Sequence, residues 1–431
     1  MAGGMMRPAC IPPPVSRGNR VVVHPASFVA SAVMPGTVAL SSFDFQQRTR
    51  LIYGPGTLQT QLVPAVRELN CGKALLVTDA GLRQAGHATC AERLLRDAGL
   101  QCHVYDDVHE NPTADDVDAC TAFARSCGAD VLIGLGGGSS MDCAKGANFL
   151  LTNGGRIHDY KGVGKARLPM LPMIAVPTTA GTGSEAQSFA VIADAQTHLK
   201  MACGDVKAAC RVAILDPLLT LTMPLSVTAA TGIDAMTHAI ESFVTVRRNT
   251  ISGMFAGQAW ELLSRAFPRV LSDPADVDAR GCMQVGAFLA GAAIENSMLG
   301  AAHAAANPLT AQFGTTHGHA VGLMMPHVIR CNAELPEIAP LYAQLVQRAG
   351  WGGAVAGESA AGAGELLAAG FVGLLKLAGL PTTLPEAVGE VPDPQLIQRL
   401  AADAAQQWTG TFNPRRLEAA DFAALYTRAL L

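Results

Sequence analysis

One segment constrains the fold of this 431-residue chain more than any other. An apolar run, Val131–Leu135, leads directly into the three glycines Gly136–Gly138 and then into a helical pattern. A strand that turns straight into a helix is typical of a parallel sheet, whose strands need helical crossovers. Glycines let backbone N–H groups approach an anion closely, and a helix N-terminus adds partial positive charge. The segment therefore predicts either a pyrophosphate site or a plain tight turn between strand and helix.

Apolar runs alternate with helical patterns on both sides of this unit, from Phe43 to about Pro217. Thr113 and Asp116 have capping-box spacing and predict a helix that runs to about Ser126. The strand candidates are Ala74–Thr78, Cys102–Tyr105, Val131–Leu135, Ile174–Val176, Ala190–Ala193 and Val212–Leu215. We therefore predict an N-terminal α/β domain over residues 43–217, built on a Rossmann-like parallel sheet.

The pattern changes after Asp216-Pro217, where long helical periodicities replace the strands. They cover Ser226–Val244, Ser252–Leu271, Gly281–Asn296, Glu337–Ala349, Glu365–Ala378 and the last thirty residues. A stretch rich in glycine and alanine, Gly350–Gly364, predicts a flexible connection. Because 431 residues exceed one ordinary domain, we assign residues 218–431 to a second, all-α domain.

The first 42 residues differ from the rest, because they are basic, rich in proline and free of acidic residues. Such a composition occurs in targeting segments. However, His24, Pro25 and Pro35 interrupt the apolar part, which is too broken for a membrane span. We interpret residues 1–42 as a disordered tail or an over-long start, with Met34 as a plausible true start, and keep a targeting segment as the alternative.

Charge and cysteine content exclude several functions. The net charge is −4 and no Lys/Arg cluster tracks a phosphate backbone, so we expect no nucleic-acid partner and no membrane association. The eleven cysteines are odd in number and form no C-x-x-C pair, which favours thiols in a reducing compartment, the cytoplasm. Any metal would therefore be held by oxygen and imidazole ligands.

Four potential metal ligands lie in the helical half. Asp234 and His238 stand four residues apart in a helical pattern and so project from one face. His303 is followed fourteen residues later by His317. One carboxylate and three imidazoles suit Fe(II) or Zn(II), although any single histidine is more often a hydrogen-bonded core residue. Glu241 is interpreted as a bystander that either supports a ligand or lies at the surface, and His319 and His327 as supporting or structural groups.

Polar positions in the α/β half suggest a dinucleotide. Asp79 ends an apolar strand, where a carboxylate accepts hydrogen bonds from a ribose diol and repels a 2′-phosphate; the alternative is a helix N-cap. Asp142 and Lys145, one helical turn apart, either orient the glycine turn or the dinucleotide, or form an exposed ion pair. The threonine-rich run Pro177–Glu185 suits contact with cofactor phosphates or a nicotinamide amide, and the alternative is a plain polar loop.

Together these segments resemble the iron-containing (group III) alcohol dehydrogenases, which are related more distantly to glycerol dehydrogenase and dehydroquinate synthase. The matching pieces, in order, are Tyr53–Gly56, Val77–Asp79, Asn111–Thr113, Gly136–Lys145, Pro177–Glu185, Gly232–Glu241 and His303–Gly318. The resemblance implies a dehydroquinate synthase-like architecture and reversible, NAD-linked hydride transfer between an alcohol and its aldehyde or ketone. It also implies a homodimer or larger assembly.

The resemblance assigns roles to individual residues. It places iron, with zinc as the alternative, in a cleft on Asp234, His238, His303 and His317. The implied NAD contacts are Asp79, Gly136, Gly137, Gly138, Ser139, Asp142, Thr178, Thr179, Thr182 and Lys200. One position departs from the family pattern: Asn307 stands where a second histidine is usual, and asparagine does not relay protons near neutral pH. Leu299, Phe313 and Phe288 are our predicted pocket-lining residues.

Two other functions compete with this interpretation. The first is a relative of glycerol dehydrogenase or dehydroquinate synthase, which would oxidise a polyol or cyclise its substrate with zinc on one carboxylate and two histidines. The fourth ligand position argues against it. The second is a catalytically silent protein that binds NAD or a metal, with Asn307 as a first sign of lost activity. The intact ligands and glycine turn argue against that.

Overall fold

The structure is a computed structural model that describes residues 42–196, 200–351 and 360–431. The predicted N-terminal extension, residues 1–42, lies outside the described residues apart from Ser42. Residues 352–359 of the predicted connection Gly350–Gly364 lie outside them as well. The rest of that prediction is wrong at its end, because a helix already begins at Ala360. Alanine is the strongest helix former and outweighs the interspersed glycines there.

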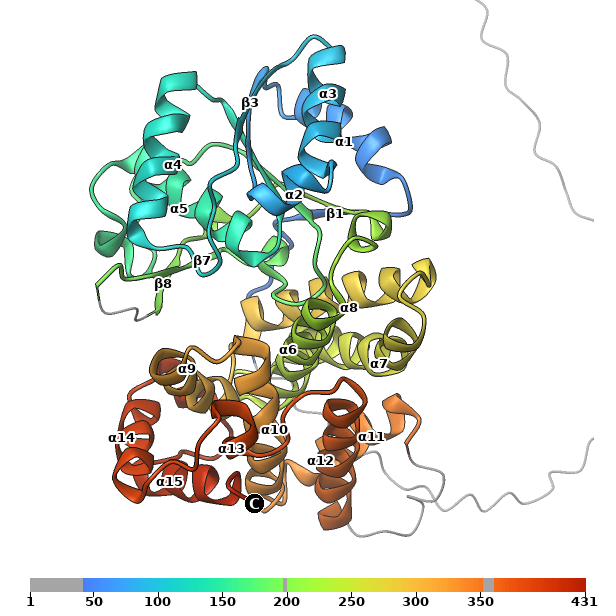
Figure 1. Cartoon of the computed structure of the whole chain (residues 1–431), viewed down its shortest axis with the longest axis vertical. Helices are drawn as coiled ribbons and strands as arrows, with labels where there is room; N and C mark the ends of the chain where they lie inside the picture. The colour runs from blue at the N-terminus through green and yellow to red at the C-terminus, as the bar shows by residue number, and fades with distance from the viewer. Residues whose placement is uncertain (1–41, 197–199, 352–359) are drawn as a thin grey trace, which may run out of the picture. The chain divides into compact units, whose positions relative to one another are not determined.

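A six-stranded parallel sheet forms the centre of the α/β part, in the order β1-β9-β6-β4-β2-β3 (Figure 1). In that order the strands are β1 (Arg50–Tyr53), β9 (Val212–Leu215), β6 (Met173–Pro177), β4 (Val131–Gly136), β2 (Lys73–Val77) and β3 (Gln101–Tyr105). This confirms the predicted Rossmann-like parallel sheet. The edge strand β1, whose four residues are half-buried or exposed, was not predicted.

Helices cover both faces of this sheet. Helices α1 (Thr57–Glu68) and α3 (His87–Asp97) bury apolar side chains against one face. Helices α4 (Ala114–Cys127) and α5 (Gly138–Asn153) cover the other face. The predicted capping box of α4 is present, with the Thr113 and Asp116 side chains each accepting a hydrogen bond from the other residue's backbone. The result is a doubly wound α/β/α arrangement.

A second, three-stranded sheet has the order β5-β8-β7. Strand β7 (Phe189–Ala193) pairs antiparallel with β8 (Lys200–Gly204), and β5 (Gly162–Val163) pairs parallel with β8. The predicted strand Ala190–Ala193 therefore exists but does not join the parallel sheet. Its apolar run indicates a buried strand, whereas the choice of partner depends on tertiary packing.

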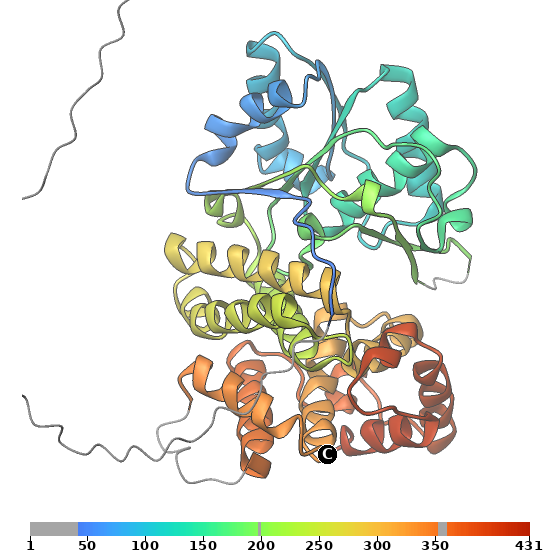
Figure 2. The same ribbon diagram turned by 180° about the vertical axis from the view of Figure 1, so that it is seen from behind.

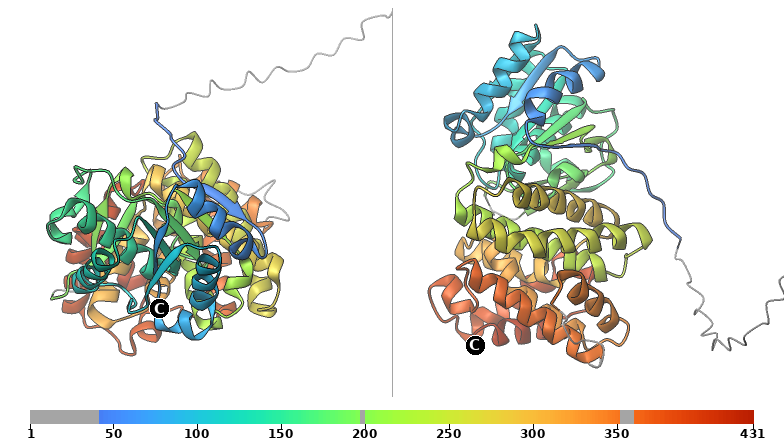
Figure 3. Two further views of the ribbon diagram at one scale, coloured as in Figure 1. Left: turned by 90° about the horizontal axis from the view of Figure 1, so that it is seen from above. Right: turned by 90° about the vertical axis from the view of Figure 1, so that its right-hand side faces the viewer.

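The helical part is built around α6 (Leu225–Val244), which is buried along most of its length. Helices α7 and α8 pack side by side against it (Figures 2 and 3). The helices of this part are α6, α7 (Thr250–Ser272), α8 (Val277–Ser297), α9 (Ala301–Phe313), α10 (His317–Asn332), α11 (Ala339–Ala349), α12 (Ala360–Leu377), α13 (Leu384–Val388), α14 (Pro394–Ala405), η6 (Trp408–Phe412) and α15 (Ala419–Arg428). The short helices before it are α2 (Ala80–Gln84), η1 (Ile157–Tyr160), η2 (Ser184–Ala186), η3 (Val206–Ala208) and η4 (Pro217–Thr220).

Helices α9, α10 and α13 were not predicted, and α14 overlaps the predicted last thirty residues only at its end. Helix α9 contains Pro308 and α10 contains Pro326, and an internal proline argues against a helix in a sequence pattern. Both helices are nevertheless formed, since packing supplies more helical stability than propensity does. Within the described residues no single helix is long and apolar enough to cross a membrane, and the one pair that reaches this length together, α8 and α9, is bent by 105°.

The strand order determines where a ligand binds. From β2 the chain continues to β3 on one side, and from β4 it continues to β6 on the other side. In open α/β sheets, ligands occupy the crevice at the carboxyl ends of the two strands where the order reverses. Here those ends carry Asp79, which follows β2, and the glycine turn, which follows β4.

Candidate active site and metal centre

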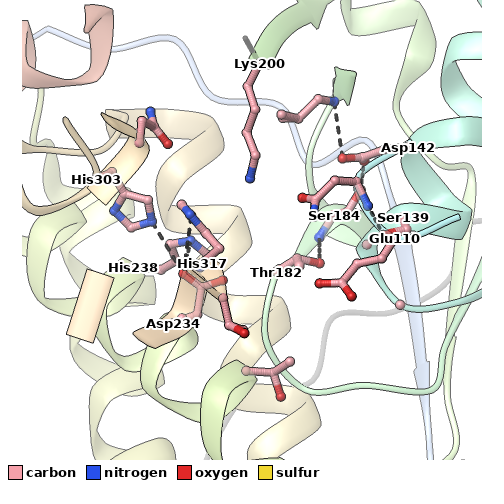
Figure 4. Close-up of a pocket in the computed structure, with 18 of the residues that line it drawn as sticks. Glu110, Ser139, Asp142, Thr182, Ser184, Lys200, Asp234, His238, His303 and His317 are labelled. Carbon is pink, nitrogen blue, oxygen red and sulfur yellow. Dashed lines mark hydrogen bonds and ion pairs between the residues drawn. The ribbon is translucent and has the colours of Figure 1, made fainter. Parts of the chain in front are cut away.

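A cavity of about 540 Å³ is lined by residues from both the α/β part and the helical part. The α/β part contributes the glycine turn and the threonine-rich loop: Gly137, Gly138, Ser139, Thr179 and Thr182. The helical part contributes the four predicted metal ligands: Asp234, His238, His303 and His317. Figure 4 shows the two groups facing the same space. The cavity therefore brings together the two sites that the sequence placed in separate halves.

The four predicted ligands come from three helices. Asp234 and His238 lie one turn apart on α6, His303 lies in the first turn of α9, and His317 begins α10. The Nε2 atoms of His238, His303 and His317 lie 3.4, 3.5 and 4.0 Å from Asp234 Oδ1. Two donors at about 2.1 Å from one tetrahedral ion lie roughly 3.4 Å apart. The spacing thus fits a single ion, most closely for Asp234, His238 and His303, whose candidate donor atoms all lie within 4.8 Å of one another.

Several polar atoms of this cluster have no hydrogen-bond partner in the described part of the chain. Asp234 Oδ1 and His303 Nε2 are buried and unpartnered, as are the Nδ1 atoms of His238 and His317. An unsatisfied buried polar atom is costly, and buried charges are normally paired or bound to a metal. A cation among the three Nε2 atoms would satisfy Asp234 Oδ1 and His303 Nε2 together, whereas the Nδ1 atoms of His238 and His317 belong to the opposite sides of their rings. The residues therefore fit the metal that the ligand pattern predicts.

Glu241, one turn beyond His238 on α6, orients His303. Its carboxylate accepts hydrogen bonds from His303 Nδ1 at 2.6 Å, from the Gly300 amide at 3.0 Å and from the Ala302 amide at 2.6 Å. This fixes the proton on Nδ1 and leaves Nε2 free to bind a metal. From the sequence, Glu241 was a bystander that either supports a ligand or lies at the surface. It is buried, so the surface alternative is wrong. Its spacing from Asp234 on the same helix is the signal that points to it.

The cluster favours positive charge. Burial alone would raise the pKa of Asp234, but His238 and the other two histidines hold it well below its usual range. Burial alone would lower the pKa of His303, but Glu241 and Asp234 raise it to about 9. Burial lowers the pKa values of His238 and His317, so these two rings are neutral donors, as metal ligands must be.

Replacing Glu241 with glutamine is expected to weaken metal binding about 10- to 100-fold. Both carboxylate oxygens accept N–H groups, so either orientation of the Gln amide places an NH₂ group against a donor. Competition with a chelator under anaerobic conditions measures this affinity. Glu261→Gln on α7, outside the cavity, is the matched control. An unchanged metal affinity in Glu241→Gln would contradict the orienting role.

The glycine turn and the threonine-rich loop contact each other closely. A Cβ added to Gly138 would lie 2.7 Å from Thr182 Cγ2, so only glycine fits this contact. Gly137 is the N-cap of α5, and the cavity lies at the N-terminus of that helix. Of the other predicted cofactor contacts in the described chain, Gly136 ends β4 and Thr178 is buried, and neither lines the cavity.

Asp79 has the helix-capping role that was the alternative interpretation. Its Oδ1 accepts a hydrogen bond from the Leu82 amide at 2.9 Å, at the N-terminus of α2. It stands at the end of β2 but does not line the cavity. The cap uses one carboxylate oxygen, which leaves the other available to a ribose.

Lys145 is fully buried and the Asp142 side chain is only 14% exposed, so the alternative of an exposed ion pair is wrong. Lys145 Nζ donates to Ser184 O at 2.6 Å, to Ser184 Oγ at 2.7 Å and to Phe189 O at 3.0 Å. Asp142 accepts from Ser184 Oγ at 2.6 Å and from the Val191 amide at 3.2 Å. The pair therefore ties α5 to the threonine-rich loop and to the start of β7.

Of the other residues predicted to lie at the cofactor or the substrate pocket, two line the cavity and two do not. Lys200 on β8 lines the cavity, its amine points towards the metal cluster (Figure 4), and burial lowers its pKa. Leu299 lines the cavity as predicted. Phe288 packs with Leu215 between the sheet and α8, and Phe313 packs against the helical core, so neither lines it. These two predictions are wrong because an apolar residue near a ligand can face either side of its helix.

Known protein families match almost the whole described chain. The family described as "Iron-containing alcohol dehydrogenase" matches residues 48–217, and "Fe-containing alcohol dehydrogenase family, C-terminal" matches residues 228–430. The chain belongs to the iron-containing alcohol dehydrogenase family. Membership makes this dehydrogenase a metal-dependent, NAD-linked oxidoreductase that acts on CH–OH groups, which confirms the predicted enzyme class.

Individual relatives agree with this assignment. The NAD-dependent methanol dehydrogenase of Bacillus methanolicus is 33% identical over 365 residues, which is 85% of this chain and 94% of the relative. A solved 1,3-propanediol oxidoreductase has a TM-score of 0.85 and 31% identity, covering 90% of this chain and 100% of its own. The sulfoacetaldehyde reductase of Bifidobacterium kashiwanohense, solved with NAD⁺, has a TM-score of 0.79 and 26% identity, covering 90% of this dehydrogenase and 99% of its own chain.

Proposed function

We propose that this dehydrogenase interconverts a small alcohol and its aldehyde or ketone, with Fe(II) held by Asp234, His238, His303 and His317. The observation that carries the proposal is the buried cluster of unpartnered donor atoms, which lies in one cavity with the glycine turn. The family supports iron, whereas zinc fits the same donors. When bound, the metal supplies a Lewis acid that polarises the substrate oxygen, and NAD supplies the hydride acceptor.

The chain's own residues would bind and orient the cofactor. We assign the pyrophosphate to the N-terminus of α5, over Gly137–Ser139. Asp79 would accept the adenosine ribose hydroxyls through the oxygen that does not cap α2. Thr179, Thr182 and Lys200 would lie nearer the nicotinamide. Gly136, Asp142 and Thr178 would act by shaping the turn and the loop, because Gly136 and Thr178 do not line the cavity and Asp142 is bonded to Ser184.

Further features of the protein belong to the same proposal. The named relatives act on methanol, 1,3-propanediol and sulfoacetaldehyde, which supports a small substrate here. Because Asn307 does not titrate, we propose that the substrate proton exchanges with water rather than with this side chain. We also propose a homodimer in the cytoplasm, with an NAD-binding domain over residues 43–217 and a metal-binding domain over 218–431.

Metal analysis of anaerobically purified protein, followed by NADH absorbance across a panel of alcohols and aldehydes, tests the proposal. We expect about one iron per chain and NADH formation that a chelator abolishes. Zinc with turnover restricted to polyols would favour the glycerol dehydrogenase-like alternative. Bound iron without turnover of any alcohol or aldehyde would favour a silent binding protein.

A further inference from the structure

The wall of the cavity next to the metal cluster contains a hydrogen bond between two amide side chains. Asn307 lies one helical turn beyond His303 on α9 and lines the cavity. Its Nδ2 donates to Gln407 Oε1 at 3.0 Å, and Gln407 also lines the cavity. Because Gln407 immediately precedes η6, this bond fastens η6 to α9 at the cavity wall.

An aromatic pair connects the two parts of the chain at this wall. Trp408 of η6 stacks on Phe189 of β7, with ring centroids 6.2 Å apart and an interplanar angle of 22°. Both rings line the cavity. Phe412 packs edge-on against Trp408, with centroids 5.8 Å apart, and Arg247 lies over the Phe412 ring. The Phe189–Trp408 contact therefore forms the wall of the cavity between β7 and η6. The contact between Phe412 and Trp408 supports this wall.

The exposure of Trp408 indicates a wall rather than a core residue. Trp408 is 44% exposed, whereas Trp260 in the helical core is fully buried. An indole that lines a cavity and is also half open to solvent stands at the rim, with the cavity inside and water outside. Trp408 therefore packs only part of its ring into the fold and leaves the rest accessible.

We propose that the Phe189–Trp408 pair, held in place by the Asn307–Gln407 hydrogen bond, limits the length of the alcohol, so that the substrates are short-chain alcohols. This inference rests on the proposed function. A longer chain would have to part the two stacked rings before its hydroxyl reached the metal cluster. Phe189 and Trp408 act by contact with the substrate, and Asn307 acts as a positioning residue through Gln407.

Truncating either ring is expected to shift the chain-length profile. In the wild type, kcat/KM should fall as linear alcohols lengthen from 1-butanol to 1-octanol. Trp408→Ala and Phe189→Ala should raise kcat/KM for 1-octanol at least about tenfold, since each newly buried methylene contributes roughly fourfold. Because ethanol is too short to reach the wall, the ratio of kcat/KM for 1-octanol to kcat/KM for ethanol should rise by the same factor. Asn307→Leu, which keeps both rings, should shift the profile in the same direction but less.

Tyr53→Ala is the matched control, because Tyr53 is 47% exposed and does not line the cavity; its chain-length profile should equal that of the wild type.

A binding measurement tests the length limit even if a variant loses its turnover. Phe189→Ala keeps Trp408 as a fluorophore, so titration with 1-octanol should change its emission at lower alcohol concentration than in the wild type. The inference is overturned if the wild type prefers 1-octanol, or if both ring variants keep the wild-type profile and binding. If no alcohol is turned over by any variant, the proposed function fails, and the binding titration still decides the length limit.

Discussion

Replacing His303 with alanine is expected to remove the bound metal and the alcohol-dependent formation of NADH together. His303 Nε2 faces Asp234 Oδ1 at 3.5 Å, and Glu241 holds the other ring nitrogen. Without the ring, the cluster loses one of its closest donors, and the Glu241 carboxylate loses its strongest partner while staying buried. Metal content should fall below about a tenth of the wild-type value, and kcat should fall at least about 10³-fold.

Metal content by elemental analysis and NADH absorbance at saturating alcohol are the two measurements. His327→Ala is the matched control, since His327 lies on α10 like His317 but does not line the cavity. It should keep its metal and its turnover. Wild-type turnover in a His303→Ala protein that contains no metal would show that the cluster is not the reaction centre.

Replacing Lys145 with methionine is expected to cost about 3 kcal/mol of unfolding free energy and to weaken NAD binding. Methionine fills a similar volume but leaves Ser184 O and Phe189 O without their shared donor. It also leaves the partly buried Asp142 without its neighbouring cation, and desolvation already raises the pKa of that carboxyl against the opposing effect of Lys145. Since these bonds hold the threonine-rich loop against α5, NAD affinity should fall about tenfold.

Urea unfolding gives the stability change, and calorimetric titration with NAD gives the affinity. Lys376→Met on α12 is the control, because Lys376 is exposed and should change neither value by more than a few tenths of a kcal/mol. Equal stability of Lys145→Met and wild type would contradict a structural role for the buried pair. A loss of stability with unchanged NAD affinity would show that the Lys145 bonds stabilise the fold but do not position the threonine-rich loop for NAD.

Most of the fold, and part of the site, could be predicted from patterns that lie within single elements of the sequence. The strand that runs into three glycines, the capping box of α4 and the i, i+4 pair on α6 each depend on residues within one element. Their spacing is set by strand and helix geometry, so the sequence displays it directly. The sequence by itself therefore determined the parallel sheet, the helical second half and two ligands on one helix face.

Only the tertiary structure decided which of these features meet. His303 and His317 reach Asp234 because α9 and α10 pack beside α6, and the prolines inside those two helices conceal them from pattern reasoning. The burial of Lys145, the transfer of β7 to a second sheet and the contact of Phe189 with Trp408 likewise join elements distant in the chain. Such contacts arise from helix crossing angles, sheet pairing and burial, which depend on many side chains at once, and no local period of the sequence records them.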